Sequence, residues 1–86
     1  MTREMAEILG LQGLAWLAAA PDGLERFLMA SGADAASLRQ AASDPAQLGL
    51  ILEFLLAHED LLVRFCEEVS TKAQTVHAAR HILEGA

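Results

Sequence analysis

The sequence predicts an all-α protein, a compact bundle of five to six short helices with no sheet. Hydrophobic residues make up 53% of the 86 residues, and many of them are Ala and Leu, which are strong helix formers. Tyr is absent and no segment alternates apolar with polar residues, so strands have little support. Apolar residues instead recur at helical spacing between start and stop signals. The length fits one domain over residues 1–86.

The first helix is predicted over about residues 3–19. Thr2 precedes it and can cap its free amides, and Pro21 ends this helix or starts the next one. The uncharged run from Ile8 to Ala20 resembles part of a secretory signal. Acidic residues stand where such a signal carries positive charge, and the run is shorter than the roughly 20 residues that span a bilayer. We therefore interpret it as a structural helix.

The second and third helices are predicted over about residues 22–31 and 35–42. Gly32 separates them, because glycine accepts the left-handed conformation that ends a helix. Asp34 can cap the third helix, which buries little beyond Leu38 and alanines. The apolar stripe of the second helix is Leu24, Phe27 and Leu28.

The fourth helix begins at the pair Asp44–Pro45, because Asp caps free amides and Pro is tolerated at the first helical position. It runs to about Leu56, is apolar on nearly every side, and is therefore expected at the centre of the fold. The fifth helix, about residues 59–69, presents one apolar face. That face consists of Leu62, Phe65, Cys66 and Val69.

The last helix is predicted over about residues 72–84, with Ser70 or Thr71 as its cap. Its inward residues are Val76, Ala79 and Leu83, and Gly85 follows its end.

In the fifth helix, Asp60 and Arg64 are four residues apart and are expected to pair.

Three phrases resemble a family of small bacterial proteins, found mainly in alphaproteobacteria, catalogued as domain of unknown function 3572. They are LQGLAWLA, DGLERFLMASGADAASLR and LGLILEFLLAHEDLLVRFCEE. The similarity covers about residues 6–85 and depends on the order of two patterns, LxRFL-x-x-[ST]-G-x5-LR and LxFLLxxExLL-x-x-F. The resemblance implies a small, helical, cytoplasmic bacterial protein, and it assigns no activity and no site.

Composition excludes several function classes. The net charge of −6 disfavours non-specific binding to nucleic acids or anionic membranes. Cys66 is the one cysteine, sits in an apolar stripe beside two glutamates, and is interpreted as a core thiol. The sequence contains no evident nucleophile–base pair and no cofactor motif. We therefore predict a protein that is not an enzyme, with no catalytic residue and no cofactor.

Three constellations have both a functional and a structural interpretation. His77 and His81 are one helical turn apart, with Glu84 on the same side, a spacing that can hold zinc, but a structural zinc site needs four ligands. We interpret them as surface residues and predict no metal site. The run 58–60, His-Glu-Asp, suits an acid–base pair but better suits helix capping. Residues 24–42 have the spacing of a helix-turn-helix but few base-reading side chains. DNA binding through this segment and weak metal binding through His77 and His81 are therefore the alternatives and not the prediction.

The clearest functional signal is an excess of apolar residues in the first and fourth helices, which one stripe on each helix cannot accommodate. Exposed apolar surface usually marks an interaction site, and Met and aromatic residues are enriched in interfaces. We predict binding to another protein or to a second copy, with a homodimer as the simplest form. The predicted interface residues are Met5, Ile8, Leu11, Trp16 and Met29. The alternative is that the two helices pack against each other and hide the excess.

Overall fold

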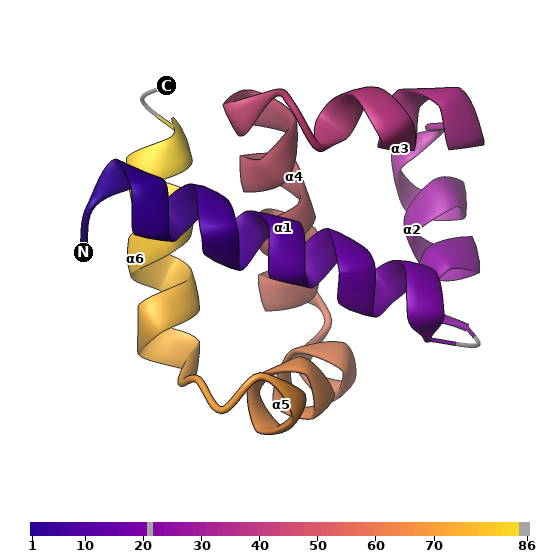
Figure 1. Cartoon of the computed structure of the whole chain (residues 1–86). Helices are drawn as coiled ribbons and strands as arrows, with labels where there is room; N and C mark the ends of the chain where they lie inside the picture. The colour runs from indigo at the N-terminus through magenta and orange to yellow at the C-terminus, as the bar shows by residue number, and fades with distance from the viewer. Residues whose placement is uncertain (21, 85–86) are drawn as a thin grey trace.

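The computed structural model describes residues 1–20 and 22–84, and over these residues it contains six α-helices and no strand (Figure 1). The helices are α1 (Arg3–Ala19), α2 (Gly23–Ser31), α3 (Ala35–Ala41), α4 (Pro45–Ala57), α5 (Glu59–Glu68) and α6 (Ala73–Glu84). The predicted all-α class is confirmed, and every predicted boundary lies within one residue of the observed one. None of these helices is both long and apolar enough to cross a membrane.

The helix starts follow from short polar side chains that satisfy free amides. Thr2 Oγ1 accepts a hydrogen bond from the Met5 amide at 3.1 Å. Asp34 accepts one from Ser37 at 2.8 Å, and Asp44 accepts one from Ala46 at 3.0 Å. These three predicted caps are confirmed. The predicted role of Pro21 lies outside the described residues.

Two further chain reversals depend on left-handed backbone. Gly32, with φ of 73°, ends α2 as predicted. Ser70 adopts a φ of 55° after α5, and the next amide, that of Thr71, donates to the Cys66 carbonyl at 2.9 Å. The sequence predicts Ser70 or Thr71 as the cap of the last helix, but this segment closes the end of α5 instead. The last helix begins at Ala73, where the Lys72 carbonyl accepts the first-turn amides.

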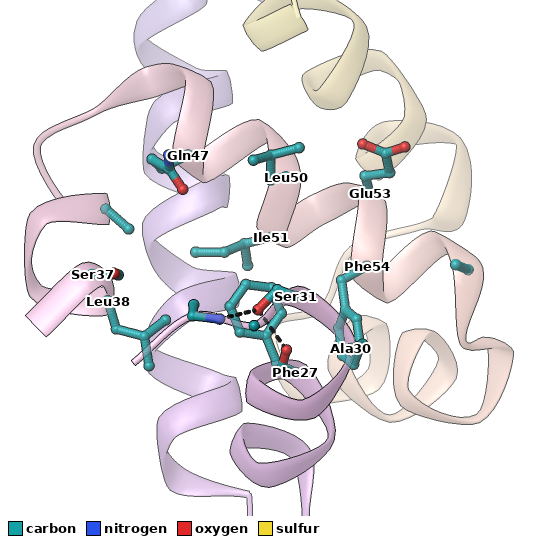
Figure 2. A pocket seen from close by; sticks show the side chains of 14 residues that line it. Phe27, Ala30, Ser31, Ser37, Leu38, Gln47, Leu50, Ile51, Glu53 and Phe54 are labelled. Carbon is teal, nitrogen blue, oxygen red and sulfur yellow. Dashed lines mark hydrogen bonds between the residues drawn. The ribbon is translucent and has the colours of Figure 1, made fainter. Parts of the chain in front are cut away.

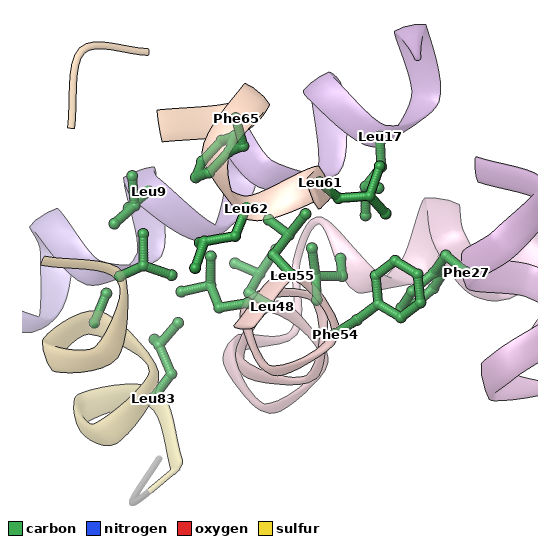
Figure 3. Packing of buried hydrophobic residues seen from close by; sticks show 14 of the residues in the cluster. Leu9, Leu17, Phe27, Leu48, Phe54, Leu55, Leu61, Leu62, Phe65 and Leu83 are labelled. Atoms are coloured by element: carbon green, nitrogen blue, oxygen red, sulfur yellow. The ribbon is translucent and has the colours of Figure 1, made fainter. Parts of the chain in front are cut away.

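The core forms where α1, α4 and α6 pack against one another, with α5 closing one end and α2 and α3 lying to one side (Figure 1). Helix α4 contacts α1, α3, α5 and α6, so the predicted central position of the fourth helix is confirmed. Side chains from all six of these helices contribute to this core, and Figure 3 shows many of them. Its largest fully buried members are Phe65, Leu17, Ile51, Leu52, Leu55, Leu61, Leu83 and Val76.

Glycines allow α1 and α4 to approach closely. A Cβ atom built at Gly10 would lie 2.8 Å from the Cβ of Leu48, which is closer than real Cβ contacts. Gly13 also faces α4 but has ordinary spacing, because a Cβ there would lie 3.4 Å from the ends of Ile51 and Leu52. The inner side of α1 is thus packed on α4. This packing buries part of the excess of apolar residues in the first and fourth helices.

Candidate functional site

The outer side of α1 is a mainly apolar surface, interrupted near its N-terminal end by the exposed Glu4. The side chains of Met5, Ile8 and Leu11 are 55%, 50% and 40% exposed, and Met1 precedes them at 50%. Their spacing of three or four residues places them on one side of the helix, opposite the buried Ala6, Gly10, Gly13 and Leu17. We call the exposed residues Met1, Met5, Ile8, Leu11, Gln12, Ala15, Ala18 and Ala19 the α1 outer face.

The α1 outer face has few polar groups. From Ile8 to Ala19, the exposed positions include no charged residue, and Gln12 is the one polar side chain among them. Charges lie at the N-terminal end of the helix, on Arg3, Glu4 and Glu7. A helix side of this composition is typical of an interface and unusual for a surface that only meets water.

Three of the five predicted interface residues lie together on this face, and two do not. Trp16 is half-buried at its border, with its ring edge-on to Phe65 at a centroid distance of 5.9 Å. The guanidinium carbon of Arg64 lies 5.5 Å from the Trp16 ring centre, within range for a cation–π contact. Met29 is 79% exposed but belongs to α2.

A cluster of charged side chains ties α2 to α5. Arg26 donates two hydrogen bonds to the carboxylate of Asp60, at 2.8 and 3.2 Å. Asp22 lies 3.6 Å from Arg26 and 3.7 Å from Arg64. The predicted pair of Asp60 with Arg64 is therefore wrong: each residue pairs across to α2 or its N-cap, because tertiary packing brings those partners closer.

The Arg26 hydrogen bonds lower the pKa of Asp60 from its ordinary value of 3.8 to about 2. A carboxyl whose pKa is lower in the folded than in the unfolded protein stabilises the fold when the pH is above its unfolded pKa. For Asp60 this stabilisation is lost as the pH falls from about 4 to about 2.

We therefore expect Asp60→Asn to lower the thermal midpoint at pH 6, with the gap to wild type narrowing once the pH falls below about 4, a window set by the same pKa shift. Circular dichroism melts between pH 6 and pH 3 measure the gap. Glu59→Gln, in the same first helical turn, is the control and should show a smaller effect. A gap that stays constant over this pH range would contradict the assignment.

A cleft lies between α2, α3 and α4. It has a volume of about 590 Å³, within the range of small-molecule sites. Phe27 and Phe54 form one wall, edge-on to each other at 5.1 Å, and Leu38 and Leu50 face them (Figure 2). Glu53 is the one charged residue of the lining. The cleft can accept an apolar group of moderate size.

Two of the polar side chains in this cleft, Ser31 and Glu53, are engaged within the protein. Ser31 Oγ donates to the Phe27 carbonyl at 2.7 Å and accepts from the Ala33 amide at 3.2 Å (Figure 2). Glu53 lies 3.6 Å from Arg80. The cleft lacks a hydrogen-bonding group that is buried and free to orient a polar ligand, within the part of the chain that the structure describes.

Sequence reasoning missed the cleft. Its floor and sides include small residues, among them Ala30, Ala33 and Ala41. The alanine-rich third helix was the available signal, since short side chains cannot fill the space between three helices. Periodicity could not show where that space opens, because this depends on how α3 is placed against α4.

Within residues 58–60, His58 satisfies a carbonyl at the end of α4, while the start of α5 has no side-chain cap. The Nδ1–H of His58 donates to the Phe54 carbonyl at 2.9 Å, and the two rings lie 4.2 Å apart. Asp60 is held by Arg26. Cys66 is half-buried, and burial raises the pKa of its thiol, which favours the unreactive protonated form.

The histidines of α6 occupy exposed positions, whereas the helix pair α2–α3 contributes Phe27 and Ala41 to the core. His77 and His81 are both exposed, and the Glu84 carboxylate lies 4.0 Å from Arg80. No group of three or more metal-binding side chains gathers within residues 1–20 and 22–84. Helix α3 is seven residues long and carries Arg39 as its basic residue, which offers little for reading base edges.

The fold and these surfaces define a small all-α protein of short helices. The chain belongs to the family described as protein of unknown function (DUF3572), whose model matches residues 3–86. The resemblance noted in the sequence is thereby confirmed. No curated protein and no solved structure matches the chain.

Proposed function

We propose that this protein is a non-enzymatic binding module that acts by attaching the α1 outer face to another protein, in the simplest case a second copy of itself. The observation that carries the proposal is the uncharged, largely apolar outer side of α1 from Ile8 to Ala19. The net charge of −6 makes two copies repel each other. The uncharged outer side of α1 from Ile8 to Ala19 is therefore the surface where this repulsion opposes contact least.

Burial of this face would remove apolar surface from water at roughly 25 cal/mol per Å². A strip one helix wide gives an interface at the small end of the known range, near 1,200 Å² in total. We therefore expect a dimer that dissociates in the micromolar range, which calls for measurements at hundreds of micromolar protein.

The test is sedimentation equilibrium of Ile8→Glu and Leu11→Glu beside wild type. Each substitution places a charge on the α1 outer face without touching the core, and we expect a shift from dimer toward monomer by at least tenfold in the dissociation constant. The matched control is Val63→Glu on α5, where the native side chain is 48% exposed. It should leave the dissociation constant unchanged.

Three results would count against this form of the proposal: a wild-type monomer at the highest concentration, equal weakening by Val63→Glu, or no weakening by either α1 variant. Trp16→Glu is less suitable than the other two variants because Trp16 also packs on Phe65, so its loss would affect folding.

A further inference from the structure

We propose that two copies pair through their α1 helices in antiparallel orientation, with the twofold axis passing between Leu11 and Gln12. This inference rests on the proposed function and adds the orientation and register of the partner helix. The observations that carry it are the distribution of side-chain size and of charge along the α1 outer face.

Side-chain size falls along this face from one end to the other. The large exposed residues Met1, Met5, Ile8 and Leu11 occupy the N-terminal part. The exposed residues of the C-terminal part, Ala15, Ala18 and Ala19, are alanines. Two such faces fill space only when the large half of one meets the small half of the other, because packed interfaces reach the density of protein interiors.

Antiparallel pairing satisfies this requirement and also fixes the register. With the axis between Leu11 and Gln12, Ile8 of one copy faces Ala15 of the other, and Met5 faces Ala18. Parallel pairing would instead place Met5 against Met5 and Ala15 against Ala15, which overfills one end and leaves the other end empty. An isologous dimer has a twofold axis, and an axis perpendicular to α1 produces the antiparallel arrangement.

Charge supports the same orientation. The acidic residues of α1, Glu4 and Glu7, lie at its N-terminal end, and the exposed C-terminal part carries no charge. Parallel helices would bring together four carboxylates and two Arg3 guanidiniums of two acidic chains, a net excess of negative charge with an energetic cost. Antiparallel helices separate the two acidic pairs and place each near the alanine end of the partner, which Arg64, Glu67 and Glu68 of α5 border.

Disulfide trapping separates the two orientations. In a Cys66→Ala background, Ile8→Cys and Ala15→Cys proteins are mixed and equilibrated in a glutathione buffer, and the covalent dimers are identified by mass. In the antiparallel register the two copies of residue 8 are offset by seven residues, about 10 Å along the helix, which exceeds the Cα separation of about 7 Å that a disulfide tolerates. We expect the mixed 8–15 dimer to exceed each same-site dimer at least tenfold.

A second pair, Met5→Cys with Ala18→Cys, repeats the test if a variant of the first pair fails to fold. Predominant 8–8 and 15–15 dimers would overturn the antiparallel inference while leaving self-association intact. Sedimentation of the Cys66→Ala parent as a monomer at hundreds of micromolar would instead overturn the homodimer itself. A parent that dimerises without any trapping at residues 5, 8, 15 or 18 would overturn the register and the assignment to α1 together.

Discussion

Replacing Phe65 with Ala should destabilise the protein by about 3–5 kcal/mol, the usual cost of truncating a fully buried Phe. Phe65 is 0% exposed, belongs to α5, and meets Trp16 of α1 edge-on. Its removal would leave a cavity between two helices that are distant in sequence. Against a total stability of roughly 5–15 kcal/mol for a small domain, this loss is large.

Urea denaturation followed by circular dichroism measures the change, and Trp16 fluorescence reports the loss of the ring contact. The control is Val63→Ala on the same helix, which truncates a half-exposed side chain and should change stability by no more than about 0.5 kcal/mol. Equal losses for the two variants, or a loss below about 1 kcal/mol for Phe65→Ala, would contradict the buried position of Phe65.

The two glycines of the α1–α4 contact should respond differently to alanine. At Gly10 the new Cβ would lie 2.8 Å from Leu48 Cβ, an atom next to the backbone that moves only if the helix moves. Overpacking costs about 1–3 kcal/mol, which exceeds or cancels the gain of about 1 kcal/mol in helix propensity. We expect Gly10→Ala to lower stability by up to about 2 kcal/mol on this balance.

Gly13→Ala is the matched variant, because it makes the same substitution on the same side of the same helix. Its Cβ would meet only side-chain methyl groups, those of Ile51, Leu52 and Leu55, at 3.4 Å. We therefore expect it to be neutral or to stabilise by up to about 1 kcal/mol. Thermal melts of both variants decide the matter, and a Gly10→Ala protein as stable as Gly13→Ala would show that α1 and α4 do not approach so closely.

The helices could be predicted from the sequence because their signals are local. Thr2, Asp34 and Asp44 each act on an amide two or three residues away, and Gly32 acts on its own backbone. The same local reasoning assigned Ser70 and Thr71 to the wrong helix. A short polar residue between two helices can serve either end, and only the backbone angle of Ser70 decides between them.

Features that depend on distant residues could not be predicted in this way. Asp60 was predicted to pair with Arg64 because Arg64 is the nearest opposite charge on the same helix. In the structure Asp60 pairs with Arg26, which lies 34 residues earlier in the sequence. The cleft beside Phe27 and Phe54 likewise depends on the placement of α3. The sequence left two explanations for the apolar excess of α1, packing against α4 or an exposed interaction surface, and each describes one side of the helix. Gly10 and Gly13 lie against α4, and Ile8 and Leu11 face outward. The role of that outward side stays a prediction.

The packing of α1 against α6 has a consequence for how quickly the chain folds. These helices lie near opposite ends of the sequence (residues 3–19 and 73–84) and both pack on α4 between them. Helical proteins usually fold fast because most of their contacts are local. Here α6 can pack on α4 after closure of the short segment that contains α5, but its contact with α1 requires closure of a long loop, which carries an entropic cost. The part of α1 that packs on α6 therefore stays exposed until that loop closes, and partially folded chains would be prone to aggregate during that interval.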